Sequence, residues 1–363
     1  MGARASSTAL TGCSRLFSPT HPDTNPGDRR RSALLPTESF LDSPVFLCGH
    51  RKSGTTLLVC LFDNHPELLT YPCDSGFFYK VFPACLSSAK AQSIVALADH
   101  SIRHCLRKEM ANVQRPNLFD VDAIAERFRR LSEAADGSPR SLLQSLFQAY
   151  GELCGQEPSG WKAWVEKTTS TEIYALEIAE WFPKAKFIHL MRDPRDNYAS
   201  LKSGWQERYH LQEVEPRGLL QSLLDRAGLG MRLAQSNRAV LGADRYMVVR
   251  FEDLTQTPEA HLREMSDFIG VSYHPSLATP SVNGVAWPGN NFDGQQFQGL
   301  SAANVGRWSE RIEPREAATI EFFMADVMRA HGYDLTTSIE ERACAAADHY
   351  KWFNFSSRGR GTS

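Results

Sequence analysis

The residues best suited to binding or catalysis lie in one glycine-bounded stretch and the two threonines that follow it. Its cations, hydroxyls and glycine are Arg51, Lys52, Ser53, Gly54, Thr55 and Thr56. The apolar run 45–48 before it predicts a buried strand, and the apolar spacing after Thr55 predicts a helix. A strand, a tight loop and a helix N-terminus aim several backbone N–H groups at one point, where a tetrahedral anion fits. The stretch therefore predicts a phosphate-binding loop.

The glycine spacing matches the nucleotide-triphosphate loop G-x-x-x-x-G-K-[ST], but Thr55 stands where that motif has its lysine. The cation lies inside the loop instead, at Lys52. The loop is thus phosphate-loop-like without being a Walker A sequence. The structural alternative is a turn that needs glycine only for its dihedral angles. Six donor-rich residues in succession favour the anion site.

A second candidate anion site follows another apolar run, 185–191. Arg192 comes directly after this predicted strand, Pro194 suits the first turn of a helix, and Ser200 would lie two turns along it. A nucleotide with phosphates at its 5′ and 3′ positions needs two such sites, whereas ATP needs one site and magnesium ligands. We find no convincing magnesium-binding acid, since the nearest candidate, Asp193, directly precedes the proline.

Apolar runs that predict strands alternate with segments that predict helices. The expected strands are 45–48, 67–71, 160–169, 185–191 and 245–250. The expected helices are 91–108, 121–133, 141–154, one from 171, one within 207–235, 258–269 and 314–331. This alternation indicates an α/β fold, a three-layer sandwich with a central parallel sheet. Asp74 should lie just past the second strand, at the edge where ligands bind such sheets.

Segment boundaries divide the chain into a flexible leader at 1–40, one domain at 41–335 and a less organised C-terminal tail at 336–363. Within the domain we expect helical insertions at about 77–155 and 205–240. The segment 281–301 is rich in Gly, Asn and Gln and predicts a long loop.

Composition limits the classes of function. The 363 residues are 42% hydrophobic and 23% charged, with a net charge of −2, so any anion site is local and no nucleic-acid partner is expected. The eight cysteines include no C-x-x-C pair and no metal-like spacing, and are interpreted as reduced thiols, which favours a cytoplasmic location. The sequence has neither an apolar run of ~18 residues that could span a membrane nor an ordinary secretory signal.

The chain resembles the sulfotransferases that use 3′-phosphoadenosine 5′-phosphosulfate (PAPS), especially their bacterial and tyrosylprotein branch. The resemblance runs from Pro44 to about Asp334 and rests on RKSGTT at 51–56, RDPRDNYAS at 192–200, RFEDL at 250–254 and RW at 307–308. It implies a P-loop NTPase-like fold and an enzyme that transfers a sulfuryl group to a hydroxyl or amine by in-line displacement, with no metal required.

The resemblance also implies roles for individual residues. The segment Arg51–Thr56 would hold the 5′-phosphosulfate, with Lys52 or Arg51 neutralising the bridging oxygen. Arg192 and Ser200 would bind the 3′-phosphate. Two further cations, Lys167 and Arg307, fall where the family has a catalytic or cofactor-contacting lysine and a late basic residue.

One departure from the family pattern concerns the general base. The tyrosylprotein branch has Gly-Glu-Glu after its second strand, whereas this chain has Tyr-Pro-Cys-Asp ending at Asp74. We take Asp74 as the base, with Glu166 and His50 as rivals and a turn or cap aspartate as the structural alternative.

Two other functions stay open at this point: a P-loop nucleotide kinase, or a non-catalytic nucleotide-binding protein on the same fold. The acceptor, whether carbohydrate, peptide, lipid or small molecule, and the oligomeric state are not predicted.

Overall fold

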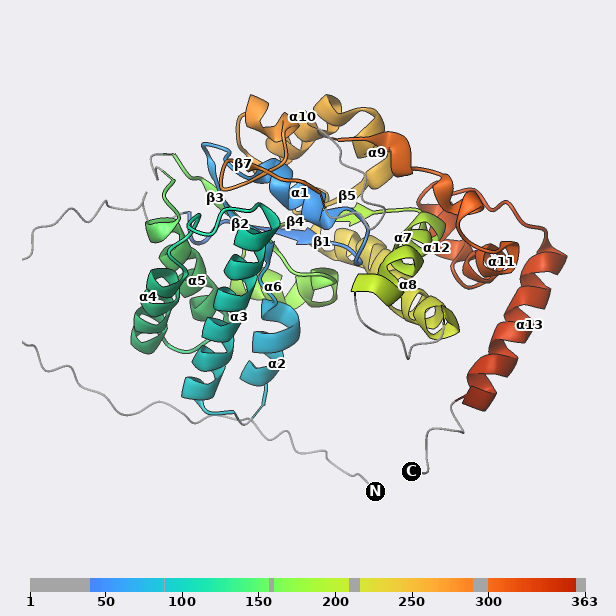
Figure 1. The fold of residues 1–363 in the computed structure, drawn as a ribbon, viewed down its shortest axis with the longest axis horizontal. Helices are drawn as coiled ribbons and strands as arrows, with labels where there is room; N and C mark the ends of the chain where they lie inside the picture. Colours follow the sequence, from blue (N-terminus) through green and yellow to red (C-terminus); the bar gives the residue numbers. More distant parts are fainter. Residues whose placement is uncertain (1–39, 88, 157–159, 209–215, 290–299, 357–363) are drawn as a thin grey trace, which may run out of the picture. The chain divides into compact units, whose positions relative to one another are not determined.

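A five-stranded parallel sheet forms the centre of the computed structural model, which describes residues 40–87, 89–156, 160–208, 216–289 and 300–356 (Figure 1). The strands are β1 Pro44–Cys48, β2 Leu68–Asp74, β3 Ala163–Lys167, β4 Lys186–Met191 and β5 Tyr246–Arg250. Their order across the sheet is β2-β3-β1-β4-β5. Because all pairings are parallel, the carboxyl ends of the strands meet at one edge.

Helices cover both faces of this sheet, as in a three-layer α/β fold (Figure 1). The α-helices are α1 Thr55–Phe62, α2 Phe82–Cys85, α3 Ala91–Asn112, α4 Val121–Ala134, α5 Pro139–Leu153, α6 Ala175–Trp181, α7 Pro194–Arg208, α8 Pro216–Leu241, α9 Phe251–Gln256, α10 Pro258–Ile269, α11 Pro314–Phe323, α12 Ala325–Ala330 and α13 Ile339–Ser356. Short π or 3₁₀ turns are η1 Phe77–Val81, η2 Thr171–Tyr174, η3 Pro275–Ala278, η4 Ala302–Asn304 and η5 Arg307–Glu310.

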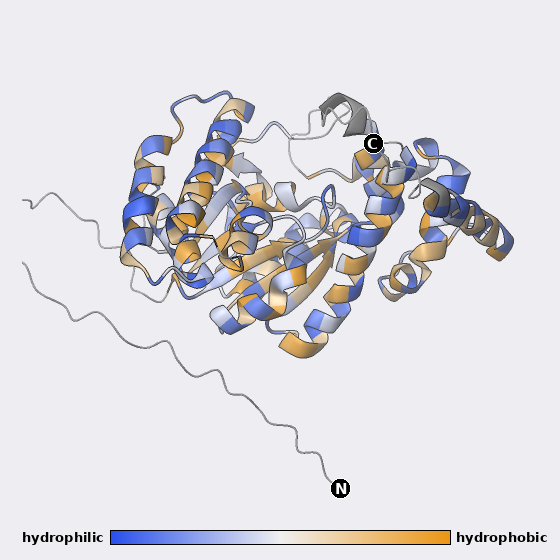
Figure 2. Cartoon of the chain, turned by 90° about the horizontal axis from the view of Figure 1, so that it is seen from below, coloured by the Kyte–Doolittle hydropathy of each residue, from blue (hydrophilic) through white to orange (hydrophobic). Residues whose placement is uncertain are grey.

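The core is built around the sheet, and aromatic side chains fill much of it. Trp164 on β3 is fully buried and stacks on Phe147 of α5, with ring centroids 4.0 Å apart. Phe46 on β1 contacts Trp164 edge-on and stacks on Phe187 of β4. The strands in Figure 2 carry mostly apolar residues, while the surrounding helices mix apolar and polar ones, as amphipathic helices that cover a sheet do.

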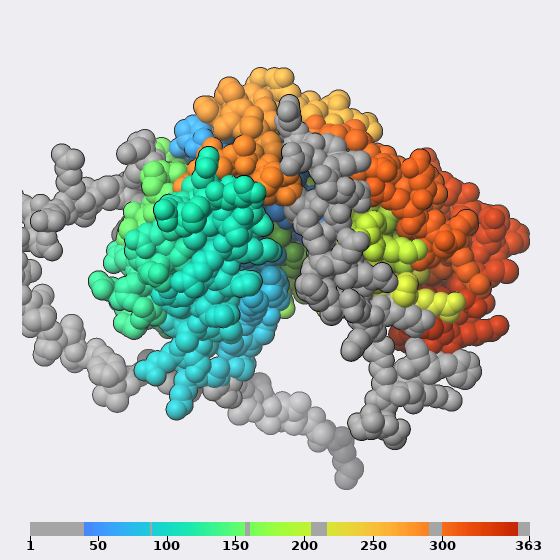
Figure 3. Space-filling model, in the orientation of Figure 1, coloured from blue at the N-terminus to red at the C-terminus, as the bar shows by residue number. Residues whose placement is uncertain are grey.

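The expected helical insertion at 77–155 consists of η1 and α2–α5. The space-filling view places α3 on one side of the described residues and the C-terminal helices α11–α13 on the other (Figure 3). The expected leader at 1–40 lies outside the described residues except for its last position.

Four expectations differ from the structure. The segment 339–356 is not a loose tail but the helix α13, which packs against α11 through Phe323, His349 and Tyr350. The predicted helix 314–331 is interrupted at Met324 and forms α11 and α12. The predicted loop after residue 281 begins with a small antiparallel ribbon, β6 Ser281–Val282 and β7 Val285–Ala286.

The fourth difference concerns the cysteines. Cys73 and Cys105 form a disulfide that joins the end of β2 to α3, so the interpretation of all cysteines as reduced is wrong for this pair. Among the described residues Cys48, Cys60, Cys85, Cys154 and Cys344 are free thiols. In the part of the chain that the structure describes, no helix has the length and apolar character that crossing a bilayer requires.

Candidate active site

The candidate residues meet at the carboxyl edge of the sheet because they follow four adjacent strands. Asp74 is the last residue of β2, rather than lying just past it, and pairs in register with Lys167 at the end of β3. The glycine-bounded loop leaves β1 next to them, and Arg192 follows β4 on the other side of β1. The two anion sites are therefore neighbours, as expected from the sequence.

The loop after β1 needs its glycines for both conformation and space. Gly49 has a φ of +135°, and an added Cβ would lie 2.5 Å from the carbonyl oxygen of Leu190. Gly54 has a φ of +99°, and its Cβ would lie 2.5 Å from the ring of Phe251. Lys52 itself adopts a left-handed φ of +66°. This tight loop presents the N-terminus of α1, which a phosphate-binding loop requires.

Arg192 connects the loop to a distant segment. Its Nη1 donates to the carbonyl oxygen of Lys52 at 3.0 Å, and its Nη2 donates to that of Asn304 at 2.9 Å. The guanidinium lies over the ring of Phe251, 4.9 Å from its centroid. Burial lowers the pKa of Arg192, and nearby carboxylates, first Asp196, oppose that shift. Its Nε is buried without a hydrogen-bond partner among the described residues, so a donor is left for an anion.

Asn197 is a site residue that the sequence did not single out. Its Nδ2 donates to the carbonyl oxygen of Arg51 and to the Oγ of Ser53, both at 3.0 Å. It therefore fixes the loop from helix α7. The sequence feature that could have identified Asn197 is its position in the RDPRDNYAS motif, but that motif does not indicate which side chains face the loop. Ser200, predicted on the same helix, lies there half-buried.

Asp196 holds the segment that carries Arg307. Its carboxylate accepts from the backbone N–H of Gly306 at 2.6 Å and from that of Trp308 at 2.9 Å. Together with the bond from Arg192 to Asn304, these contacts place the turn η5 beside the second anion site. Of the predicted long loop 281–301, residues 290–299 lie outside the described residues.

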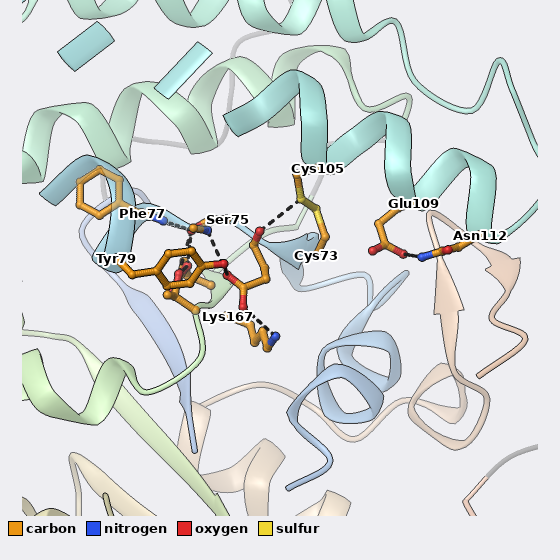
Figure 4. The surroundings of a disulfide bond; sticks show 12 residues. Cys73, Ser75, Phe77, Tyr79, Cys105, Glu109, Asn112 and Lys167 are labelled. Atoms are coloured by element: carbon orange, nitrogen blue, oxygen red, sulfur yellow. Dashed lines mark hydrogen bonds and ion pairs between the residues drawn. A yellow bond between two sulfur atoms is a disulfide. The ribbon is translucent and has the colours of Figure 1, made fainter. Parts of the chain in front are cut away.

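Asp74 and Lys167 form an ion pair, with the ammonium 3.0 Å from Oδ2. The Lys167 side chain is buried, whereas that of Asp74 is partly exposed. Burial alone would raise the pKa of Asp74, but the ion pair and the hydrogen bonds from Tyr79 and Thr169 lower it below its usual value. Asp74 is thus ionised at neutral pH and reachable from solvent. Tyr79 and Lys167 both donate a hydrogen bond to this carboxylate, and Figure 4 shows these two side chains close together.

The disulfide lies one residue before Asp74. It ties β2 to α3, the first long helix of the insertion, so this helix cannot move away from the carboxylate while the bond is intact (Figure 4). No local sequence signal indicated the pairing, because Cys73 and Cys105 are 32 residues apart.

Glu166, a rival for the role of base, is fully buried on β3. Its Oε1 accepts hydrogen bonds from Ser75 at 2.5 Å and from Thr168 at 2.6 Å, and its Oε2 has no partner among the described residues. Burial raises its pKa to about 7, against the lowering effect of those hydrogen bonds. Glu166 lies behind Ser75 rather than in the open part of the site, so it could take a proton only through another group.

His50, the other rival, is buried in the loop. Burial, followed by repulsion from Arg51 and Arg226, lowers its pKa to about 3, so the imidazole is neutral at physiological pH. Its Nδ1 is buried without a partner among the described residues.

Besides Glu166, a second buried acid lies near the loop. Glu172 accepts the N–H of Gly49 at 3.0 Å, and burial raises the pKa of Glu172 to about 7. This carboxyl fixes the start of the loop.

The family model described as "Sulfotransferase family" matches residues 44–275. The chain is 25% identical over 251 residues to omega-hydroxy-beta-dihydromenaquinone-9 sulfotransferase Stf3 of Mycobacterium bovis, covering 63% of each chain. It is 24% identical over 237 residues to chicken protein-tyrosine sulfotransferase 2, covering 64% of this chain and 52% of that one. It thus spans less than two thirds of the length of these curated relatives.

Solved structures with a similar fold include the sulfotransferase domain of the Synechococcus PCC 7002 olefin synthase. That comparison has a TM-score of 0.53 and 19% identity, and covers 81% of this chain and 96% of that domain. The sulfotransferase domain from the curacin biosynthetic pathway gives a TM-score of 0.50 with 18% identity, and covers 82% of this chain and all of that domain. These likenesses confirm the expected three-layer α/β fold of the P-loop type.

Proposed function

Because the chain belongs to the sulfotransferase family, we propose that it transfers a sulfuryl group from PAPS to a hydroxyl or amine of an acceptor. The observation that carries the proposal is the position of Arg192. Its guanidinium binds the backbone of the candidate phosphate loop, and its buried Nε has no hydrogen-bond partner among the described residues. One nucleotide with phosphates at both its 5′ and 3′ positions would engage both sites. The kinase alternative has no support from the family match.

The residues present fit such a donor. The loop Arg51–Thr56 would hold the 5′-phosphosulfate through backbone N–H groups and hydroxyls, with Lys52 beside the bridging oxygen. Arg192 and Ser200 would hold the 3′-phosphate, and Arg307 would approach from the segment that Asp196 fixes. When bound, the donor supplies an activated sulfuryl group whose leaving group is a phosphate.

The chain's own residues would then stabilise developing charge and accept a proton. Sulfuryl transfer, like phosphoryl transfer, is expected to pass through a loose in-line transition state, in which positioning and cationic donors contribute most. Lys52 and Lys167 would stabilise charge on the leaving and peripheral oxygens. Asp74, fixed beside Lys167, would accept the proton of the acceptor's hydroxyl.

The test first compares how different nucleotides stabilise the protein and then measures sulfuryl transfer. Adenosine 3′,5′-bisphosphate should raise the melting temperature far more than ADP does, with or without magnesium. A radiosulfate transfer assay from labelled PAPS over carbohydrate, phenol, lipid and peptide acceptors should then identify a product. Preference for ATP with magnesium would contradict the proposal. Tight binding of the bisphosphate without transfer to any acceptor would favour the non-catalytic alternative.

A further inference from the structure

The carboxylate of Asp74 is saturated with hydrogen bonds. Among the described residues, its Oδ1 accepts from the N–H of Gly76 at 3.0 Å and from the hydroxyl of Tyr79 at 2.8 Å. Its Oδ2 accepts from Lys167 at 3.0 Å and from the amide and hydroxyl of Thr169 at 3.2 and 2.9 Å. A carboxylate offers about four lone-pair positions, so an acceptor's hydroxyl can reach it only if one donor leaves.

Tyr79 is the most exposed of the three side-chain donors, since Thr169 is half-buried and Lys167 is buried. Two of the others are backbone amides, and the Lys167 side chain is only 7% exposed. Tyr79 is 52% exposed and lies on η1, where its neighbours Phe77 and Phe78 are buried in the core. The ring can therefore turn into solvent while the backbone of η1 stays in place.

The ring of Tyr79 folds back over the turn that follows β2. A Cβ added to Gly76 would lie 3.5 Å from the ring and 3.6 Å from the hydroxyl, at ordinary van der Waals distance, so the ring lies directly against this turn. The ammonium of Lys80 lies 5.9 Å from the ring centroid. The Arg51 guanidinium is close enough to lower the pKa of Tyr79, although desolvation and Asp74 raise it overall.

We propose that Tyr79 is a gate whose hydroxyl occupies, on Asp74 Oδ1, the place that the acceptor's hydroxyl takes during transfer. The proposal rests on the proposed function, because it uses Asp74 as the group that receives the acceptor's proton. The phenol oxygen already stands at the distance that a general base requires from the hydroxyl it deprotonates. An acceptor enters by displacing the ring, and while the ring is closed its hydroxyl keeps water from that one position on Oδ1.

An open gate without an acceptor lets water take the acceptor's place. The bond between sulfur and the bridging phosphate oxygen then breaks, and a bond between sulfur and the water oxygen forms. One proton of the water passes to Asp74, and the products are sulfate and adenosine 3′,5′-bisphosphate. Hydrolysis of PAPS by water therefore reports on the gate even when the acceptor is not known.

The experiment measures the release of adenosine 3′,5′-bisphosphate from PAPS without any acceptor, in the wild type, Tyr79→Phe and Tyr79→Ala. Both variants should hydrolyse PAPS about five- to tenfold faster, the factor expected when one hydrogen bond no longer excludes water. Tyr350→Phe is the matched control, because Tyr350 is equally exposed, at 52%, and lies on α13. Its rate should equal that of the wild type.

Isothermal titration with the bisphosphate accompanies these rates and separates two kinds of failure. Affinity in the Tyr79 variants should stay within about twofold of the wild type, since the gate binds no phosphate. If the wild type binds the bisphosphate but both variants hydrolyse PAPS no faster, the gate alone is refuted. If the wild type does not bind it, the proposed function fails and the gate with it. A sulfuryl group found on Tyr79 by mass spectrometry would support the gate, because it places the phenol in the acceptor's position.

Discussion

The guanidinium of Arg192 donates a hydrogen bond to the carbonyl oxygen of Lys52 at 3.0 Å. Arg192, the first residue after β4, is thereby joined to the middle of the loop after β1. The two candidate anion sites are therefore directly connected. Any ligand with two suitably spaced phosphates can bridge them, and a change at either site is felt at the other. The predictions below follow from this arrangement and from the groups around it.

Arg192→Lys should weaken the binding of adenosine 3′,5′-bisphosphate by about 10- to 100-fold, while the binding of ADP changes much less. Lysine keeps the charge but cannot donate to two carbonyls and a phosphate in the planar arrangement of a guanidinium. Titration calorimetry with both nucleotides measures the ratio, with the exposed Arg238→Lys as a control. An equal loss of affinity for both nucleotides would show that Arg192 does not bind the 3′-phosphate.

Asp74→Asn should reduce the turnover number by about 100-fold or more and leave donor affinity nearly unchanged, because the amide cannot accept the acceptor's proton. Initial rates and bisphosphate titration together make this distinction. Glu166→Gln serves as the comparison, and Asp267→Asn on the surface as the control. Full activity in Asp74→Asn with loss in Glu166→Gln would transfer the role of base to Glu166.

Gly54→Ala should destabilise the fold by about 2–4 kcal/mol, because a left-handed backbone conformation and overpacking act together there. The new Cβ would lie 2.5 Å from the ring of Phe251. Gly270→Ala is the matched control, since its φ is +93° but its Cβ would meet nothing within 4 Å. That variant should lose only about 1 kcal/mol. Equal losses in urea unfolding would mean that the Phe251 contact relaxes without cost.

Glu166→Gln should flatten the dependence of stability on pH. Burial raises the pKa of this carboxyl from 4.5 to about 7, so the folded protein holds the proton more tightly than the unfolded chain does. The stabilisation from protonation is complete below pH 4.5 and is lost as the pH rises through about 7. Glutamine stays neutral and still accepts the hydrogen bonds from Ser75 and Thr168.

Urea unfolding at a series of pH values between 4.5 and 8 measures the effect, with Glu177→Gln on an exposed face as the control. The wild type should lose about 1–3 kcal/mol more than Glu166→Gln across that window. Because burial raises the pKa of Glu172 to the same range, the variant should keep part of the slope. Parallel curves for the wild type and Glu166→Gln would show that Glu166 is ionised at all these pH values.

Breaking the Cys73–Cys105 disulfide should cost about 3–4 kcal/mol of stability, the loop-closure entropy expected for a separation of 32 residues. Cys105→Ser and a reducing agent should have the same effect, and they should not add when combined. The exposed free thiol in Cys344→Ser provides the control. Two additional reactive thiols in the denatured, unreduced wild type would show that the bond does not form.

Much of the fold follows from local patterns in the sequence. Apolar runs predicted all five strands of the sheet because strands buried on both faces carry few polar residues. Pro194 and Pro258 marked helix starts, since proline fits the first turn of a helix. The helix α13 was missed because its apolar residues do not form one clear stripe, and contacts with α11 stabilise it instead.

The positions of the candidate site residues at strand ends could be predicted from charged residues and glycine spacing. Positions such as Arg192 and Asp74 could be placed at strand ends from the strand pattern alone. The supporting contacts of Asn197, Asp196 and Tyr79 could not, because they join residues that only the folded chain brings together. The disulfide was missed for the same reason, as its half-cystines lie on different elements.

The buried charges around Arg195 limit how far the chain can be shortened. This guanidinium contacts Asp193 and Glu321, each at 2.6 Å, and Glu321 in turn accepts the backbone N–H groups of Thr336 and Thr337. An expression fragment that stops at residue 275, where the family match ends, would remove Glu321, one of the two carboxylates that pair with this arginine. Engineered versions should therefore retain the polypeptide through residue 337 at least, which also keeps Arg307 and the segment that carries it.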